Sequence, residues 1–143
     1  MYNGYIYKNI VILEIFEGLP HTKTKSIEFE KWQKLIHETI GIINLKFEVK
    51  FFEKAHIGIY TQLPSGRNYK VWDITNRAVN VTINNLKGIF FPDDDAEHLS
   101  IIASGKICEN SKTIIYIGDF YKDYETVNFL VRLGAVPPLD EMS

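Results

Sequence analysis

The hydrophobic pattern near the N-terminus predicts one extended segment followed by a helix. Residues 5–16 are rich in β-branched and aromatic side chains, which favour strands, and Lys8 and Asn9 interrupt this run with a kink. Over 27–40 the apolar residues recur three and four positions apart, as they do on one face of a helix. Gly41 then favours the end of that helix. The apolar face comprises Phe29, Trp32, Leu35, Ile36 and Ile40.

Shorter segments with a period of two follow and predict a set of strands. Apolar and charged residues alternate strictly over 45–51, and the alternation returns over 56–63. Segments 69–74 and 78–83 flank a turn-like stretch at 75–77. We therefore expect these two segments to pair as a hairpin.

The C-terminal part of the chain predicts two helices around one buried strand. A helix is expected over 94–103, with the acidic residues 93–95 at its start. The unbroken apolar run 113–117 is typical of a strand that is buried on both faces. A last helix is expected over 121–133, and Gly134 favours its end.

These elements predict one α+β domain that spans residues 1–143. The helices do not alternate regularly with the strands, which argues against a doubly wound parallel sheet. We expect a mainly antiparallel sheet of about five to seven strands, with three helices (27–40, 94–103 and 121–133) on one face. A chain of 143 residues is long enough to bury roughly two-thirds of its unfolded surface in one core.

The composition is that of a soluble globular protein, with 45% hydrophobic and 24% charged residues. No apolar run has the roughly 20 residues that a membrane-spanning helix needs, and the N-terminus does not resemble a secretory signal. Cys108 is the only cysteine, so an intramolecular disulfide or a thiolate metal site is excluded. We expect a cytoplasmic protein without a cofactor. The excess of lysine (13) over arginine (3) is typical of an AT-rich bacterium or phage.

Charge is unevenly distributed along the chain. Residues 1–70 hold ten Lys or Arg and seven Asp or Glu, whereas residues 71–143 hold six and eleven. The net charge of −2 argues against general nucleic-acid binding, and the acidic second half favours a basic partner.

The stretch from Asp93 to His98 is a candidate metal or acid–base site. On a helix, Asp94 and Asp95 lie four and three residues before His98, so the three side chains share one face. Carboxylates and an imidazole at that spacing suit a divalent metal ion. The alternative is a helix N-terminus, where aspartates cap the first turn and complement the helix dipole. That alternative accounts for every residue of the stretch except His98.

A second candidate site gathers basic and aromatic residues around one predicted hairpin loop. Such residues stack on and pair with ligands or anchor protein interfaces. A hairpin with a buried aromatic core is the alternative. The candidate ligand- or partner-binding residues are Tyr60, Arg67, Tyr69, Lys70 and Arg77.

The sequence from Ile115 to Asp123 reads as an apolar strand followed by Gly-Asp-x-x-x-Asp. It resembles the magnesium-binding motif of haloacid-dehalogenase-type phosphatases. That chemistry also needs a nucleophilic aspartate after an N-terminal strand, and the strand of this chain that would supply it contains no aspartate, only Glu14. We therefore interpret Asp119 as the N-cap of the last helix, with Asp123 in its first turn.

Three functions remain as hypotheses. The first is a non-enzymatic binding protein, such as an inhibitor, immunity or anti-defence protein, that blocks a partner protein or sequesters a small ligand. The second is a small metal- or histidine-dependent hydrolase or nuclease that uses Asp94, Asp95 and His98. The third is a structural or oligomeric accessory subunit, which includes a homo-oligomer. The absence of familiar catalytic motifs favours the first.

Overall fold

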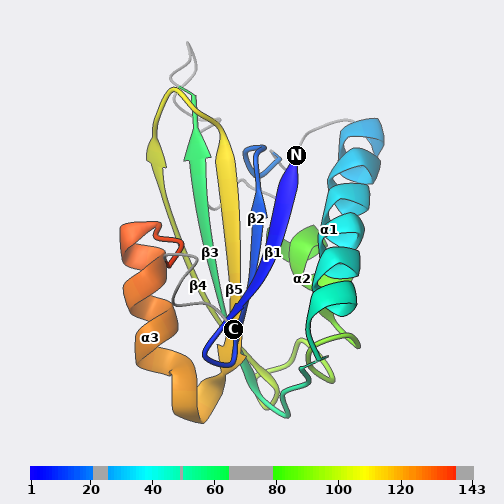
Figure 1. The fold of residues 1–143 in the computed structure, drawn as a ribbon, viewed down its shortest axis with the longest axis vertical. Helices are drawn as coiled ribbons and strands as arrows, with labels where there is room; N and C mark the ends of the chain where they lie inside the picture. Colours follow the sequence, from blue (N-terminus) through cyan, green and yellow to red (C-terminus); the bar gives the residue numbers. More distant parts are fainter. Residues whose placement is uncertain (21–25, 49, 65–78, 138–143) are drawn as a thin grey trace.

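Five strands and three helices make up the described part of the chain (Figure 1). The computed structural model describes residues 1–20, 26–48, 50–64 and 79–137. The predicted α+β class is confirmed, with a strand number at the lower end of the expected range. In chain order the elements are β1 (Tyr2–Tyr7), β2 (Ile10–Ile15), α1 (Ser26–Lys46), β3 (Ala55–Leu63), α2 (Val79–Leu86), β4 (Leu99–Ile107), β5 (Lys112–Asp119) and α3 (Phe120–Leu133).

The strands form one mixed sheet in the order β1-β2-β5-β3-β4. Three of its four pairings are antiparallel, and only β3 and β4 are parallel. Parallel neighbours need a crossover connection, and here the crossover contains α2. The prediction of a mainly antiparallel sheet is confirmed, although the crossover was not foreseen.

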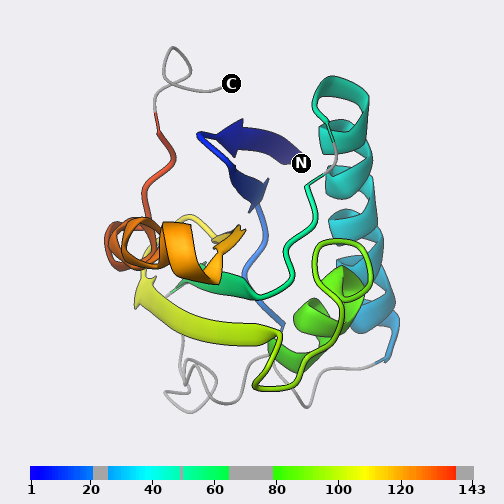
Figure 2. The same ribbon diagram turned by 90° about the horizontal axis from the view of Figure 1, so that it is seen from below.

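Helices cover both faces of the sheet, so the prediction that all helices lie on one face is wrong. Figures 1 and 2 show α1 and α2 on one side and α3 on the other. The physical reason is visible in the central strands. All six residues of β2 are buried, and only the two end residues of β5 are partly exposed. A strand that is apolar on both faces needs cover on both.

The sheet has a hydrophobic core on each face, because successive side chains of a strand point to opposite faces. On the side of α1 and α2, Ile57 and Ile117 of the sheet belong to the same core as Trp32 and Ile36 of α1. The opposite core lies under α3 and includes Ile12, Tyr60, Ile114, Tyr116, Val127, Leu130 and Val131.

Two glycines let α3 lie directly on the sheet. A Cβ atom at Gly58 would meet a methyl of Val131 at 2.0 Å, and one at Gly118 would meet Cβ of Asp123 at 2.7 Å. Only a residue without a side chain fits at such distances. The close approach fixes where α3 sits over β3 and β5.

Several predicted elements are confirmed with shifted ends. The extended segment 5–16 is the hairpin of β1 and β2, in which Lys8 turns the chain at a φ of 51°. The helix predicted over 27–40 runs over Ser26–Lys46, and Gly41 does not end it. The apolar face continues to Ile43, which is buried, so packing outweighs the cost of a helical glycine.

The strand predicted over 45–51 is wrong. Leu45 and Lys46 complete the last turn of α1, and the N–H of Phe47 donates to the carbonyl of Ile43. The alternation of charged and apolar residues here reflects a helix end and a connecting segment. It does not reflect a strand with one wet face.

The strand predicted over 78–83 is also wrong, because residues 79–86 form α2. The β-branched residues favour a strand locally, but Thr82, Ile83 and Leu86 share a helical face against α1. The other half of that predicted hairpin, 69–74, lies outside the described residues.

The helix predicted over 94–103 is wrong as well. One turn closes at Asp95, where the carbonyl accepts the N–H groups of His98 and Leu99. The chain then enters β4, which pairs with β3 along nine residues from Leu99 to Ile107. The long parallel ladder outweighs the local preference for a helix. The helix predicted over 121–133 is confirmed as Phe120–Leu133, and Gly134 ends it in a left-handed conformation.

Candidate functional site

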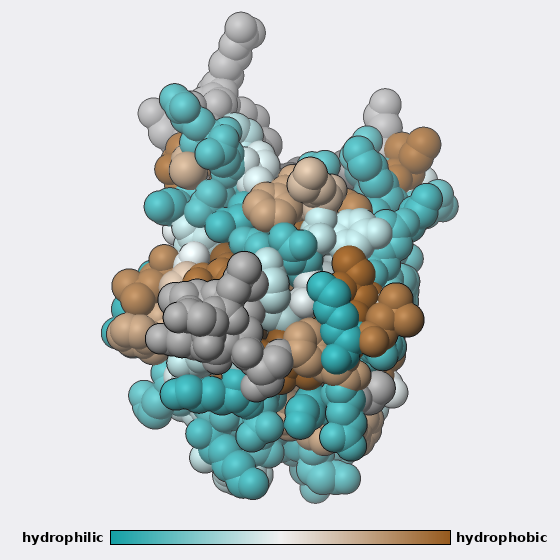
Figure 3. All heavy atoms as spheres, in the orientation of Figure 1, coloured by the Kyte–Doolittle hydropathy of each residue, from teal (hydrophilic) through white to brown (hydrophobic). Residues whose placement is uncertain are grey.

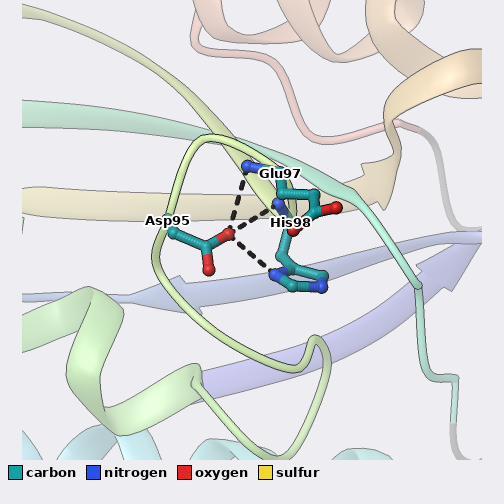
Figure 4. Close-up of side chains that lie close together, drawn as sticks. All are labelled: Asp95, Glu97 and His98. Atoms are coloured by element: carbon teal, nitrogen blue, oxygen red, sulfur yellow. Dashed lines mark hydrogen bonds and ion pairs between the residues drawn. The ribbon is translucent and has the colours of Figure 1, made fainter.

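The acidic stretch forms a tight turn that the carboxylate of Asp95 holds together (Figure 4). Its Oδ1 accepts hydrogen bonds from the backbone N–H groups of Glu97 and His98, both at 3.1 Å, and lies 2.7 Å from Nδ1 of His98. This carboxylate satisfies the same backbone donors that an N-cap satisfies at a helix start. An aspartate cap is therefore present, but at Asp95 instead of at Asp93 or Asp94, and only one turn follows it.

The turn brings two of the three predicted metal ligands together. Ligand atoms of Asp95, Glu97 and His98 all lie within 4.8 Å of one another, so Glu97 takes the place predicted for Asp94. Carboxylate oxygens and an imidazole nitrogen suit a divalent ion. Nδ1 of His98 lies 2.7 Å from Oδ1 of Asp95, so these two groups bond each other in the structure. Both carboxylates are exposed to solvent.

Asp94 faces Lys87 instead of the turn. The Lys87 ammonium lies 3.6 Å from Asp94 and 3.9 Å from Asp93. The backbone N–H of Asp94 donates to the Asp93 carboxylate at 2.8 Å, and this bond is the main reason that the pKa of Asp93 is lowered. The side chain of Asp94 and the charge of Lys87 lower that pKa further. Asp93 and Asp94 are thus accounted for by local pairing.

The second predicted site falls largely outside the described residues, since Arg67, Tyr69, Lys70 and Arg77 lie there. Tyr60 is described, and it is buried in the core under α3 with 4% of its surface exposed. Its hydroxyl donates to Oε1 of Gln62 at 3.0 Å, and burial raises its pKa.

A buried histidine that the sequence analysis did not single out links three elements. His56 of β3 is 1% exposed. Its Nδ1 lies 3.0 Å from Oγ of Ser100 on β4, and its Nε2 lies 2.6 Å from Oδ1 of Asn128 on α3. A neutral ring with hydrogen on Nε2 satisfies both bonds, since it donates to the amide oxygen and accepts from the hydroxyl. No local pattern connects these residues, because they are 44 and 72 positions apart.

Aromatic side chains from the first turns of α3 enclose the same imidazole. The ring of Tyr124 lies 4.2 Å from that of His56, and Phe120 meets it edge-on at 6.4 Å. The ammonium of Lys54 lies 4.0 Å from the centre of the Phe120 ring, as in a cation–π contact. These contacts fix the N-terminal half of α3 on the sheet.

The outer surface of α3 carries large apolar side chains that face solvent. Tyr121 is 77% exposed, Phe129 is 57% exposed and Leu133 is 59% exposed. Phe129 lies two residues from Val127 and two from Val131, so it points about 200° away from the buried side of the helix. Figure 3 shows brown and tan atoms at the left of the view, over α3. We call the side chains of Tyr121, Phe129 and Leu133 the outer face of α3.

Comparisons with protein-family models, with curated proteins and with solved structures give no match to this chain. Among the helices in the described residues, none is both long enough and apolar enough to cross a membrane.

Proposed function

We propose that this chain is a non-enzymatic binding protein and that a partner protein docks on the outer face of α3. One observation carries the proposal. The helix is apolar on both sides, since Val127, Leu130 and Val131 contact the sheet while Phe129 and Leu133 face solvent. Phe129 and Leu133 are four positions apart and so lie side by side on the exposed surface, and an exposed apolar patch is typical of an interaction site.

The residue types of the outer face support the same conclusion. Tyrosine and phenylalanine are enriched in protein interfaces, and tyrosine is one of the side chains that most often dominate binding energy. Lys122, Glu125 and Arg132 are exposed on the same helix and supply a polar rim. The helix is also anchored, because Asn128 and Tyr124 hold it to His56. An anchored face loses little conformational freedom when it binds.

Within this proposal the protein is an inhibitor, immunity or anti-defence protein that acts in the cytoplasm by blocking its partner. The single cysteine and the absence of familiar catalytic motifs support this assignment.

A photo-crosslinking experiment tests the docking face. A photoreactive phenylalanine analogue is placed at Phe129, or at Lys34 on α1 as a control for an exposed site on the other side of the sheet. Each protein is irradiated in a lysate of its source cells, and the products are identified by mass spectrometry. We expect one protein to be captured through position 129 and not through position 34. The substitution Leu133→Ser should abolish that capture while unfolding stability stays within about 0.5 kcal/mol.

Two outcomes would count against the proposal. Equal capture at both positions would mean that the outer face of α3 is not a specific surface. Capture that persists in Leu133→Ser at full yield would mean the same. A crosslink between two copies of the chain would instead favour the oligomeric accessory subunit, and sedimentation analysis would then give the stoichiometry.

The second candidate function is a metal- or histidine-dependent hydrolase or nuclease at Asp95 and His98, with Glu97 in the place predicted for Asp94. It is favoured by the proximity of Asp95, Glu97 and His98. Millimolar Mg²⁺, Mn²⁺ or Zn²⁺ should then raise the melting temperature, because an ion that binds only the folded chain stabilises it. Asp95→Ala should remove the effect. A binding protein without a metal predicts no change in melting temperature with any of the three ions.

A further inference from the structure

A cleft lies between the segment after β2 and the N-terminal half of α1, on the face of the sheet opposite α3. Its volume of about 280 Å³ is close to the lower end of the range found for small-molecule sites. The apolar part of its lining comes from Leu19, Trp32, Leu35 and Leu63. A cavity of this size suits a compact ligand with one apolar group.

Buried hydroxyls fix one wall of the cleft to the sheet. Oγ1 of Thr61 accepts the backbone N–H of Leu19 at 3.0 Å, and Oγ1 of Thr113 donates to the backbone carbonyl of Glu17 at 2.8 Å. The two hydroxyls also lie 3.0 Å apart. Between the two anchored positions, Gly18 lies so close to Leu63 that an added Cβ would meet its methyl at 2.9 Å. The wall is therefore held in place before any ligand arrives.

The aromatic part of the lining is equally fixed. The indole Nε1–H of Trp32 on α1 donates to Oγ1 of Thr82 on α2 at 3.0 Å, which sets the orientation of the ring. Only 2% of the Trp32 surface is exposed, so the ring forms part of the buried floor of the cleft.

The charged groups of the lining favour a positive ligand. Glu17 and Glu28 contribute two carboxylates and Lys31 contributes one ammonium, and all three residues are exposed at the rim. The described part of the rim therefore carries a net charge of about −1 when these groups are ionised at neutral pH. No other ionisable side chain is among the described residues that line the cleft.

We propose that this cleft binds a small organic cation, with its ammonium group paired to Glu17 and Glu28 and its apolar body against the partly exposed Leu35. The site goes beyond the partner-binding role of α3, because it lies across the sheet and shares no residue with the outer face. Failure of either proposal leaves the other standing.

Phenethylammonium is a suitable probe, and phenylacetate carries the same ring with the opposite charge. Each compound is titrated to about 10 mM into the isotopically labelled full chain, and amide and indole resonances are followed by NMR. We expect phenethylammonium to shift the resonances of Gly18, Leu19 and the Trp32 indole in a saturable way. Phenylacetate should leave them unchanged. The absence of any shift with phenethylammonium, or equal shifts with both compounds, would overturn the proposal.

Charge variants test the role of the rim. Glu17→Gln and Glu28→Gln should each raise the Kd for phenethylammonium about threefold, as expected for an exposed ion pair. Lys31→Gln should lower the Kd, since it removes a like charge. Glu30→Gln is the matched control, because Glu30 is exposed on the same turns of α1 but does not line the cleft. If Glu17→Gln and Glu28→Gln bind the probe as the parent chain does, the charge assignment is wrong.

Discussion

His56 is the only buried histidine in the part of the chain that the structure describes, and both of its ring nitrogens are bonded. Asn128→Ala removes the acceptor for the Nε2–H of an imidazole that is itself only 1% exposed. We therefore expect this substitution to lower the free energy of unfolding by about 2 kcal/mol. Ser100→Ala should cost less, about 1 kcal/mol, because its hydroxyl lies 3.0 Å from Nδ1, farther than the 2.6 Å between Nε2 and Asn128. Urea unfolding measures both values.

Thr126→Ala is the control for this pair of substitutions. Thr126 is exposed on α3 between the residues that face the sheet, and its removal should change stability by no more than about 0.5 kcal/mol. If Asn128→Ala proves as mild as Thr126→Ala, the imidazole does not depend on the amide.

Hydrogen bonds from a side chain to residues nearby in the sequence could be predicted. Hydrogen bonds between residues far apart in the sequence could not. The cap at Asp119 was predicted, and its Oδ2 accepts the N–H groups of Tyr121 and Lys122 at 3.0 and 2.9 Å. Asp95 acts on residues two and three positions later in the same way. The hydrogen bonds of His56 join β3 to β4 and α3, which become neighbours only in the folded sheet. No spacing in the sequence therefore predicts these bonds.

At the scale of elements, the approach of α3 to the sheet depends on Gly58. We expect Gly58→Ala to destabilise the protein by about 3 kcal/mol, since the new Cβ would lie 2.0 Å from a methyl of Val131 and α3 would have to shift. Gly41→Ala on α1 should instead stabilise it by up to about 1 kcal/mol, because nothing lies within 4 Å of the added methyl and alanine favours a helix. Thermal and urea unfolding of both variants give the comparison.

Each of the two glycine variants has an outcome that would contradict the expectation for it. A Gly58→Ala protein of parent stability would mean that α3 can move outward without loss. A destabilised Gly41→Ala protein would mean that the outer side of α1 is crowded.

The hydrophobic pattern predicted a helix or strand correctly where the tertiary packing favours the same conformation. It failed where the packing favours a different one. The face of α1 at Trp32 and Ile36 has helical spacing and is buried as predicted. Residues 79–83 alternate like a strand, yet residues 79–86 form a helix in which Thr82 meets the Trp32 indole and Asn85 meets His37 at 2.8 Å. Those partners lie some 50 positions away, so only the folded chain supplies the reason.

At the scale of the molecule, a rigid sheet separates two proposed binding surfaces. The buried strands β2, β3 and β5 form its centre, with the outer face of α3 on one side and the cleft beside Trp32 on the other. The α+β class could be predicted from chain length and periodicity. The distribution of helices over both faces could not, because it follows from strands that are apolar on both sides.

The core under α3 makes the stability of the whole molecule sensitive to alkaline pH. Burial raises the pKa of Tyr116, and the nearby Tyr60 and Glu14 raise it further. A group whose pKa is raised on folding stabilises the protein fully below its unfolded pKa, about 10 for tyrosine, and loses that contribution as the pH rises further. Stability should therefore fall above pH 10.

Tyr116→Phe should make that fall shallower by about 1.4 kcal/mol per pH unit, because one tyrosine no longer ionises on unfolding. The substitution also removes the hydrogen bond from the hydroxyl to the carbonyl of Ala135, so it should cost about 1 kcal/mol at neutral pH. Urea unfolding at pH 8, 10 and 11 separates the two effects, and parallel pH profiles for the parent and the variant would contradict the assignment to Tyr116.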